Sequence, residues 1–274
     1  MITTDEVLTV NGTALNTLAY NITSFTGRIR VPGRRGADSI VPGRHGSIRS
    51  PGKRYDSAEV VLTMWVLGAD EDGLIPVGAS SRELLFAHVD ALTRLFGAST
   101  VVLLQTRPDG TQRRLEGEVT KVIDFTTMAG ATRAEFAVTV SSWMAFWEDT
   151  VNVAADITGE GALTAPGFAA ATAPCDELVV TFHGPCSNPK IESGGVWVQY
   201  GFVIPAGQAI VLNCRTWELS GIGGLVPNYG LVTHGGDARW FVLAPGTPPT
   251  FTLTDTSPNP IRVQLVGRRK YLTP

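Results

Sequence analysis

Residues 80–97 have the sequence Ser-Ser-Arg-Glu-Leu-Leu-Phe-Ala-His-Val-Asp-Ala-Leu-Thr-Arg-Leu-Phe-Gly, and they carry the one clear helical pattern of the chain. Apolar residues recur at spacings of three and four between Leu84 and Phe96, which places them on one face of a helix. Ser80 and Glu83 match a capping box, and Gly97 matches a C-terminal stop. The sequence therefore predicts one amphipathic helix at about residues 81–96.

The sequence on both sides of this helix favours strands and turns. The chain of 274 residues contains 30 Gly and 17 Pro, and Val and Thr recur in short runs. Asn11-Gly12 lies between two alternating segments and is a strong hairpin signal. Residues 58–67 form a well-marked apolar strand just before the helix. We expect residues 1–150 to be a mainly β domain with one helix laid across its sheet.

The second half of the chain lacks a helical pattern. Residues 150–174 are rich in Ala, Gly and Thr, which suits a connection followed by a weak first strand. Short apolar runs separated by Gly and Pro then predict a β-sandwich or jelly roll at 151–274. The predicted strands are Leu178–Phe182, Pro189–Glu192, Val196–Ile204, Gln208–Asn213, Arg239–Leu243, Thr250–Thr254 and Pro260–Gly267.

A basic, Pro-Gly-rich segment at residues 28–54 interrupts the first domain. It contains three Pro-Gly pairs and few apolar residues, so we expect an arm that projects from the domain. Eight basic residues against Asp38 give the segment a charge of +7, and the 14 basic and 24 acidic residues elsewhere leave −10. Complementary charge favours docking on a neighbouring copy, where the acidic loop Asp70-Glu71-Asp72 supplies counter-charges. The basic residues of this intersubunit arm are Arg28, Arg30, Arg34, Arg35, Arg44, Arg49, Lys53 and Arg54.

The sequence contains no recognisable catalytic or cofactor-binding pattern. It lacks a Gly-x-Ser-x-Gly elbow, a P-loop and a dinucleotide fingerprint, and its four His are scattered without metal-ligand spacing. Its three Cys are an odd number, which favours reduced thiols. We expect no enzyme, no catalytic residue, no cofactor and no metal. Residues 1–10 suggest no signal peptide, and no apolar run is long enough for a membrane span.

Two alternatives for binding remain open from composition. Aromatic residues of the second domain favour core packing as a set, but Trp197 and Tyr229 are candidates for contact with sugar rings. The basic arm is also compatible with nucleic acid, although it lacks interleaved aromatic residues.

Several short motifs of the second half occur in a familiar order. They are Ser-Asn-Pro-Lys-Ile at 187–191, Ile-Pro-Ala-Gly-Gln at 204–208, Trp-Phe-Val-Leu-Ala-Pro-Gly at 240–246 and the basic-aromatic tail at 268–272. Together with the basic arm, the strand at 58–67 and the helix after it, they resemble the distal tail protein family of siphophages over nearly the whole chain. Thr247-Pro248-Pro249 departs from that family's usual turn.

This resemblance implies a structural virion protein and a galectin-like second domain. A member of the family forms a hexameric ring at the distal end of the phage tail tube, and joins the tube to the tail-tip hub. The implied partners are further copies of the chain, the tail tube protein, the hub protein and the tape measure protein. DNA would pass only as cargo, no membrane is involved, and assembly would take place in the host cytoplasm. The alternative is a minor tail protein whose β-sandwich binds host cell-surface polysaccharide; a wall-degrading enzyme is a weaker rival.

Overall fold

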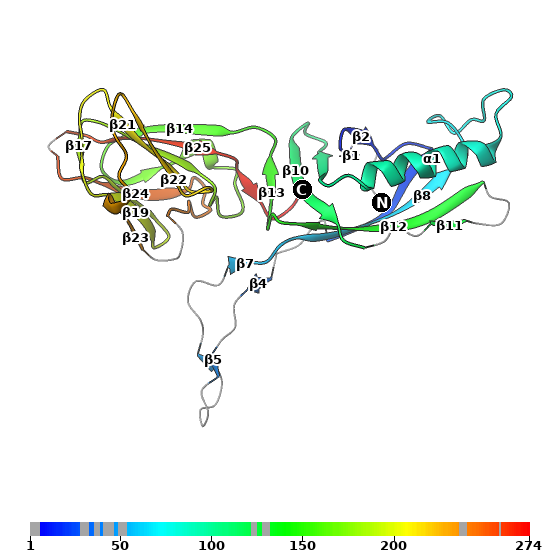
Figure 1. Cartoon of the computed structure of the whole chain (residues 1–274), viewed down its shortest axis with the longest axis horizontal. Coiled ribbons are helices and arrows are strands. Elements are labelled where there is room, and N and C mark those ends of the chain that lie inside the picture. The colour runs from blue at the N-terminus through cyan, green and yellow to red at the C-terminus, as the bar shows by residue number, and fades with distance from the viewer. Residues whose placement is uncertain are drawn as a thin grey trace. The chain divides into compact units, whose positions relative to one another are not determined.

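The computed structural model describes residues 6–27, 33–35, 39–40, 47–48, 54–121, 125–127, 132–235, 240–257 and 259–274. The chain divides into two compact units. The first unit comprises Met1–Arg34, Tyr55–Thr150 and Leu272–Pro274, and the second comprises Arg35–Arg54 and Val151–Tyr271. Strands dominate both units, which confirms the predicted mainly β fold (Figure 1). Within the described part of the chain, no helix has the length and apolar character that a membrane crossing requires.

One antiparallel sheet forms the body of the first unit. Its strand order is β2-β1-β9-β10-β12-β8-β3, and β11 adds to β12 while β13 adds to β10. The strands are β1 (Val7–Val10), β2 (Thr13–Ala14), β3 (Tyr20–Thr26), β8 (Glu59–Leu67), β9 (Val101–Thr106), β10 (Gln112–Val119), β11 (Phe125–Thr127), β12 (Arg133–Ser142) and β13 (Trp147–Asp149).

The predicted Asn-Gly hairpin joins β1 to β2. Asn11 and Gly12 have φ values of 47° and 85°, the left-handed conformation that a tight two-residue hairpin turn requires. The Asn11 side chain also accepts a hydrogen bond from the Val102 backbone N–H at 2.8 Å. This asparagine therefore both shapes the turn and links it to the strand that follows the helix.

Strict alternation along β8 separates the two faces of the sheet. The side chains of Val60, Leu62, Met64 and Val66 are fully buried, whereas the residues between them are half-exposed. In β12, Phe136 and Val138 lie on the same buried face, opposite Met64 and Leu62 of β8. This face forms the core of the unit, and the helix covers it.

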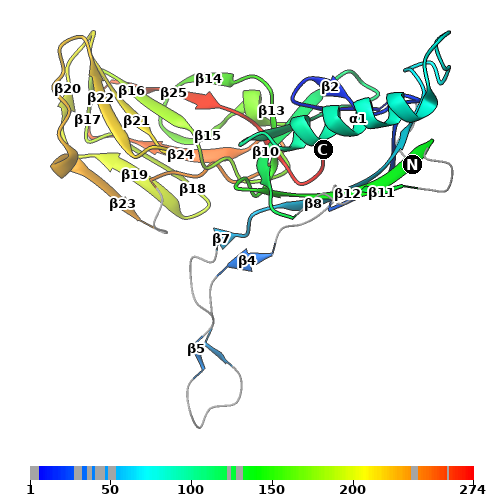
Figure 2. The same ribbon diagram turned by 45° about the vertical axis from the view of Figure 1, so that its right-hand side comes forward.

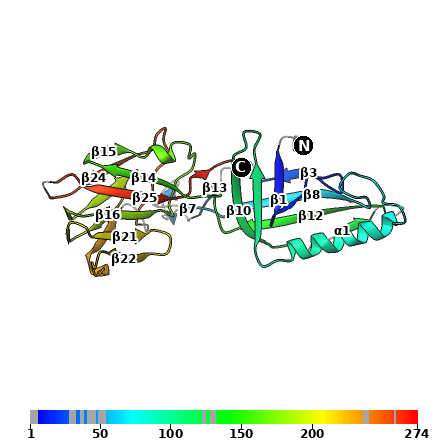
Figure 3. The ribbon, with the colours of Figure 1, turned by 90° about the horizontal axis from the view of Figure 1, so that it is seen from above.

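The helix α1 (Ser81–Phe96) has the predicted bounds. Leu85, Leu92 and Phe96 are buried, and the Phe96 ring meets the Phe136 ring edge-on with centroids 6.1 Å apart. Figure 3 shows α1 running alongside the sheet, on the side of β12 and β8.

The predicted capping residues behave differently. The Ser80 side chain makes no capping hydrogen bond, so the capping box is wrong; instead, the Ser81 hydroxyl donates to the Gly68 carbonyl at 2.7 Å. Gly97 ends the helix with φ −79°, a conformation open to any residue, and its N–H donates to the Thr93 carbonyl. The first turn is thus fastened by a contact to the end of β8, which the local sequence does not reveal.

The second unit is a β-sandwich. One sheet has the order β14-β25-β16-β21-β22, which Figure 3 shows edge to edge, and the other has the order β15-β24-β18-β19-β23. Their strands are β14 (Val153–Thr158), β15 (Gly161–Thr164), β16 (Val179–His183), β18 (Lys190–Ser193), β19 (Val196–Tyr200), β21 (Ala209–Asn213), β22 (Glu218–Ile222), β23 (Val232–Gly235), β24 (Thr250–Thr254) and β25 (Arg262–Gly267). Residues 151–271 also contain the pair β17 (Cys186–Ser187) and β20 (Val203–Ile204), the strand β26 (Lys270–Tyr271), and the 3-10 turns Pro166–Phe168 and Tyr229–Leu231.

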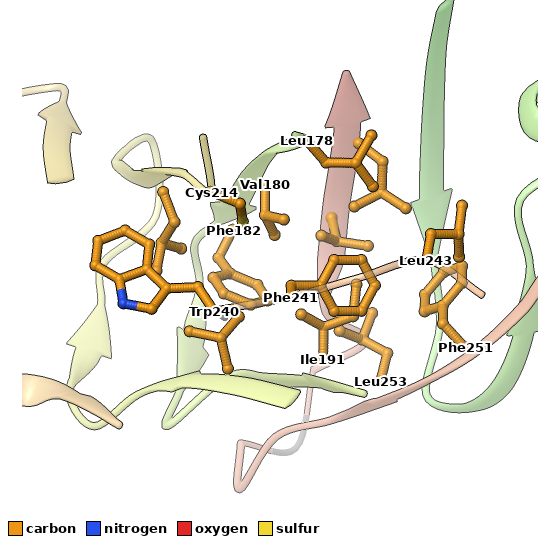
Figure 4. Packing of buried hydrophobic residues seen from close by; sticks show 14 of the residues in the cluster. Leu178, Val180, Phe182, Ile191, Cys214, Trp240, Phe241, Leu243, Phe251 and Leu253 are labelled. Atoms are coloured by element: carbon orange, nitrogen blue, oxygen red, sulfur yellow. The ribbon is translucent and has the colours of Figure 1, made fainter. Parts of the chain in front are cut away.

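Side chains from both sheets and from one irregular segment fill the space between the layers. Phe182 and Leu253 come from opposite sheets, whereas Trp240, Phe241 and Leu243 come from the irregular segment (Figure 4). Residues 240–243 were predicted as part of a strand, but the structure shows only an isolated bridge between Leu243 and Cys175 there. Arg239, the first residue of that predicted strand, lies outside the described residues.

Candidate functional site

The basic arm is described only in part. The short strand β4 (Arg34–Arg35) pairs with β7 (Arg54–Tyr55), and β5 (Ser39–Ile40) pairs with β6 (Ser47–Ile48). Figure 2 labels the short strands β4, β5 and β7 of this segment. The arm residues that lie outside the described part of the chain are Arg28, Arg30, Arg44, Arg49 and Lys53.

Aromatic packing anchors the base of the arm. The Tyr55 ring meets the buried Phe146 ring edge-on, with centroids 4.8 Å apart. The Asp56 N–H donates to the Gly33 carbonyl at 2.7 Å, which closes the base on the other strand. These contacts hold Gly33 and Asp56, at the two ends of the segment, next to each other, and the partner of its basic side chains stays a prediction.

The acidic loop before α1 combines charge with exposed apolar residues. The Asp70 carboxylate accepts hydrogen bonds from the backbone N–H groups of Asp72 and Leu74, at 3.1 and 2.7 Å. Asp70 is therefore occupied in shaping the loop, while Glu71 and Asp72 are exposed. The same loop carries exposed apolar side chains, with exposed fractions of 65% for Leu74, 55% for Ile75 and 107% for Val77.

Trp197, one of the two predicted sugar contacts, is half-buried and packs closely against its neighbours. It lies directly opposite Gly235 in the β19–β23 pair, and it occupies the space where a side chain at that glycine would stand. The Lys190 Nζ lies 4.7 Å from the ring centroid, and the same ammonium contacts the Glu192 carboxylate at 2.8 Å. The Lys190 ammonium thus occupies one face of the indole, which disfavours stacking of a sugar on that face.

Tyr229, the other predicted contact, presents an exposed ring with a fixed hydroxyl. Its exposed fraction is 56%, and its hydroxyl accepts a hydrogen bond from the Leu219 N–H at 3.0 Å. Two of the other aromatic residues of this unit, Tyr200 and Trp240, are buried in the core as expected. Trp217, which composition did not single out, is 42% exposed and lies two residues before Leu219 in the chain.

The three cysteines are buried and form no disulfide. Burial raises the pKa of the Cys186 thiol to about 12, and the nearby Asp255 carboxylate adds to the effect. Burial likewise raises the pKa of the Cys214 thiol to about 12, against a backbone hydrogen bond from Phe241 that lowers it. Among the described residues, no group of three or more His, Cys, Asp or Glu is arranged to hold a metal ion.

The chain thus combines a β sheet that carries one helix with a β-sandwich, in a mainly β protein. The chain is similar in structure to SPP1 Dit (gp 19.1), described as a paradigm of the hub adsorption apparatus in phages that infect Gram-positive bacteria. The TM-score is 0.61 at 10% sequence identity, over 96% of this chain and 98% of that chain. The predicted resemblance is thus confirmed at the level of the fold.

Two structures of the phage p2 baseplate in its activated conformation, with Sr and with Ca, align less closely. Their TM-scores are 0.40 and 0.39 at 9% and 11% identity, and each covers 96% of this chain and 98% of the other. No protein-family model and no curated protein sequence matches the chain.

Proposed function

We propose that the chain is a structural subunit of a phage tail tip, and not an enzyme. The observation that carries this proposal is the fold shared with SPP1 Dit, which extends over both units and nearly the full length of both chains. A match to one unit alone would be weak support, since single β-sandwiches serve many unrelated functions. The shared order of both units along one chain is more specific.

In this role the protein forms a hexameric ring at the distal end of the tail tube. Its partners are further copies of itself, the tail tube protein, the tail-tip hub protein and the tape measure protein, and DNA passes through the ring as cargo. The protein is then a virion component that assembles in the host cytoplasm. Identical subunits that meet through two different surfaces close into such rings when the rotation between neighbours allows it.

The arm and the acidic loop supply two such different surfaces. The arm carries a charge of +7 in its sequence, and Glu71 and Asp72 are exposed on the loop. Leu74 and Ile75 beside them add apolar area that the first unit itself leaves uncovered. Opposite charge would set the register of neighbouring copies, and apolar contact would supply most of the binding free energy.

The test is the mass of the purified protein by light scattering, followed by electron microscopy. We expect a mass six times that of one chain and closed rings in the images. A protein that stays monomeric at every concentration and salt condition would contradict ring formation.

A further inference from the structure

Trp217 occupies a backbone position that normally belongs to glycine. Its φ is 61°, in the left-handed region that bulky side chains rarely adopt. It ends the turn between β21 and β22, where its N–H donates to the Asn213 carbonyl at 2.9 Å. The Asn213 side chain holds the same turn by accepting from the Arg215 and Thr216 N–H groups, at 3.1 and 3.2 Å. A well-bonded turn thus maintains a tryptophan in an unfavourable conformation.

Packing on its inner side holds the Trp217 indole in place. The ring centroid lies 5.5 Å from that of Trp240 and 5.9 Å from that of His234. Trp240 is only 5% exposed and belongs to the core, whereas Trp217 keeps 42% of its surface exposed. The indole is therefore a rigid aromatic surface that rests on the core and faces solvent.

Tyr229 provides a second ring that is anchored to the same strand. Its hydroxyl is bonded to the Leu219 N–H, two residues after Trp217, and its ring is 56% exposed. The Asn228 side chain fixes the 3-10 turn of Tyr229 by accepting from the Gly230 N–H at 2.9 Å. Two exposed aromatic rings are thus fixed near the start of β22, each by contacts of its own.

Polar side chains surround these rings. The Thr216 hydroxyl donates to the Glu218 carboxylate at 2.8 Å, and both residues are exposed. Ser220 and His234 are also exposed and lie within the same turn-and-edge region. Carboxylate, hydroxyl and imidazole groups can each accept or donate a hydrogen bond to a sugar hydroxyl.

A peptide strand would find little to pair with at this edge of the sandwich. β22 is the last strand of its sheet, but its Leu219 N–H is already bonded to the Tyr229 hydroxyl. The Leu225 carbonyl lies against Gly221, so close that a Cβ there would stand 1.8 Å from it. The chain itself therefore covers the edge, which disfavours strand addition by a protein partner.

We infer that Trp217 and Tyr229 form a binding site for the hexopyranose units of a polysaccharide. The apolar C–H face of a pyranose ring suits a rigid aromatic surface, and its hydroxyls suit the polar rim formed by Thr216, Glu218 and His234. The site lies entirely within the second unit, so an isolated subunit would bind without ring assembly, and an oligomer would add avidity for a repeating chain.

Affinity gel electrophoresis tests this site with dextran, yeast mannan, a galactan and a β-1,3-glucan cast separately into native gels. We expect at least one of them to retard the full-length protein, in proportion to its concentration. Trp217→Gly removes the ring and suits the backbone conformation; it should weaken binding about tenfold or more, the effect of losing one well-packed contact. Trp217→Phe keeps an aromatic surface and should retain most of the affinity.

Trp143→Ala is the matched control, because Trp143 is a tryptophan of the first unit with an exposed fraction of 52%. This variant should migrate like the unaltered protein in every gel. Tyr229→Phe, which keeps the ring but loses the bond to Leu219, should bind more weakly than the unaltered protein and more tightly than Tyr229→Ala. Thermal unfolding confirms that each variant is folded. The absence of retardation in all four gels, or equal binding by Trp217→Gly, overturns the inference.

Discussion

The indole of Trp197 fills the space that Gly235 leaves on the neighbouring strand. The two residues are direct partners in the β19–β23 pair, and a Cβ on Gly235 would stand 2.5 Å from the Trp197 Nε1 atom. Trp197 therefore requires a glycine at position 235, since a larger residue and the indole cannot occupy the same volume. It also explains why a glycine ends a strand that is otherwise formed by larger residues.

Gly235→Ala should therefore destabilise the second unit by about 1–3 kcal/mol, the usual cost of forcing extra volume into a packed site. Chemical denaturation measures the free energy of unfolding. In a Trp197→Ala background the same substitution should cost much less, because the clashing ring is gone. A cost that persists unchanged in that background would assign the role of Gly235 to the backbone and not to the indole.

Leu92→Ala tests the packing of α1. The Leu92 side chain packs on the sheet and is only 1% exposed. Its truncation should therefore reduce the free energy of unfolding by roughly 2–5 kcal/mol. Leu74→Ala is the control, because Leu74 is 65% exposed and its truncation should cost almost nothing. Equal effects of the two substitutions would show that the helix face does not pack as described.

The helix was predictable because its signal is local. Apolar residues at spacings of three and four determine which face is buried, and Leu85, Leu92 and Phe96 of that pattern are buried. The capping was not predictable. Ser80 has the sequence of a cap, but Ser81 makes the bond that fastens the turn, because the carbonyl it meets lies 13 residues earlier.

Strands of the second unit were harder to predict where pairing with a neighbouring strand, and not composition, determines whether a segment forms a strand. β14 and β15 are rich in small residues and were expected as a connection with one weak strand, yet β14 pairs with β25 along its length. Residues 240–243 show the opposite error, because they were predicted as a strand but form none. Four consecutive side chains are buried there, and the segment runs between the sheets instead of within one (Figure 4).

The candidate sugar contacts depended on packing that no pattern reveals. Trp197 and Trp217 are both tryptophans of the second half, but the first is half-buried with the Lys190 ammonium over its ring, and the second is 42% exposed. Trp217 takes a glycine conformation that its sequence context does not announce. Such a residue is recognised only from its dihedral angles.

Gln105→Met should stabilise the first unit. Gln105 is fully buried, and within the described residues neither atom of its amide group meets a hydrogen-bond partner. An unsatisfied buried polar group costs about 1–3 kcal/mol, so methionine of similar shape should recover a gain of that order in the free energy of unfolding. Gln112→Met, at an exposed position of β10, is the control and should be neutral. A loss of stability in Gln105→Met would indicate that the buried amide is satisfied, for example by a buried water molecule.

Stability at high pH should depend on Cys214. Burial raises the pKa of its thiol from 9.0 to about 12, so the folded protein keeps the proton that the unfolded chain releases. Below about pH 9 both states hold the proton and this thiol has no effect on the pH dependence; from about 9 towards 12 the free energy of unfolding falls.

Urea denaturation at pH 8, 9.5 and 10.5 with reductant measures that slope. Cys214→Ala should be less stable at pH 8, because a buried group is lost, but its stability should fall less steeply with pH. An identical slope in both proteins would contradict the raised pKa. Cys186 has a similarly raised pKa and retains its own contribution in both proteins, so the comparison isolates Cys214.

Removal of the arm should leave both units folded and abolish assembly. The change replaces residues 32–52 with a short Gly-Ser bridge, and light scattering should then report a monomer whose thermal unfolding resembles that of the full chain. The proposed contact joins exposed charges, and each ion pair contributes only roughly 0–1 kcal/mol. Assembly must therefore depend on many such pairs and on the apolar residues beside the charges.

High salt should weaken assembly of the full chain, because charges are screened over about 8 Å at physiological ionic strength. Charge reversal at Glu71 and Asp72 should do the same without deleting any segment. Asp70 must be left intact, since its carboxylate holds the loop through Asp72 and Leu74. Glu160→Lys, in the second unit and away from the acidic loop in the sequence, is the matched charge control. Rings of unchanged size in the deletion variant would show that the arm does not join the subunits, and contact with DNA or with the hub protein would then be the better explanation of its charge.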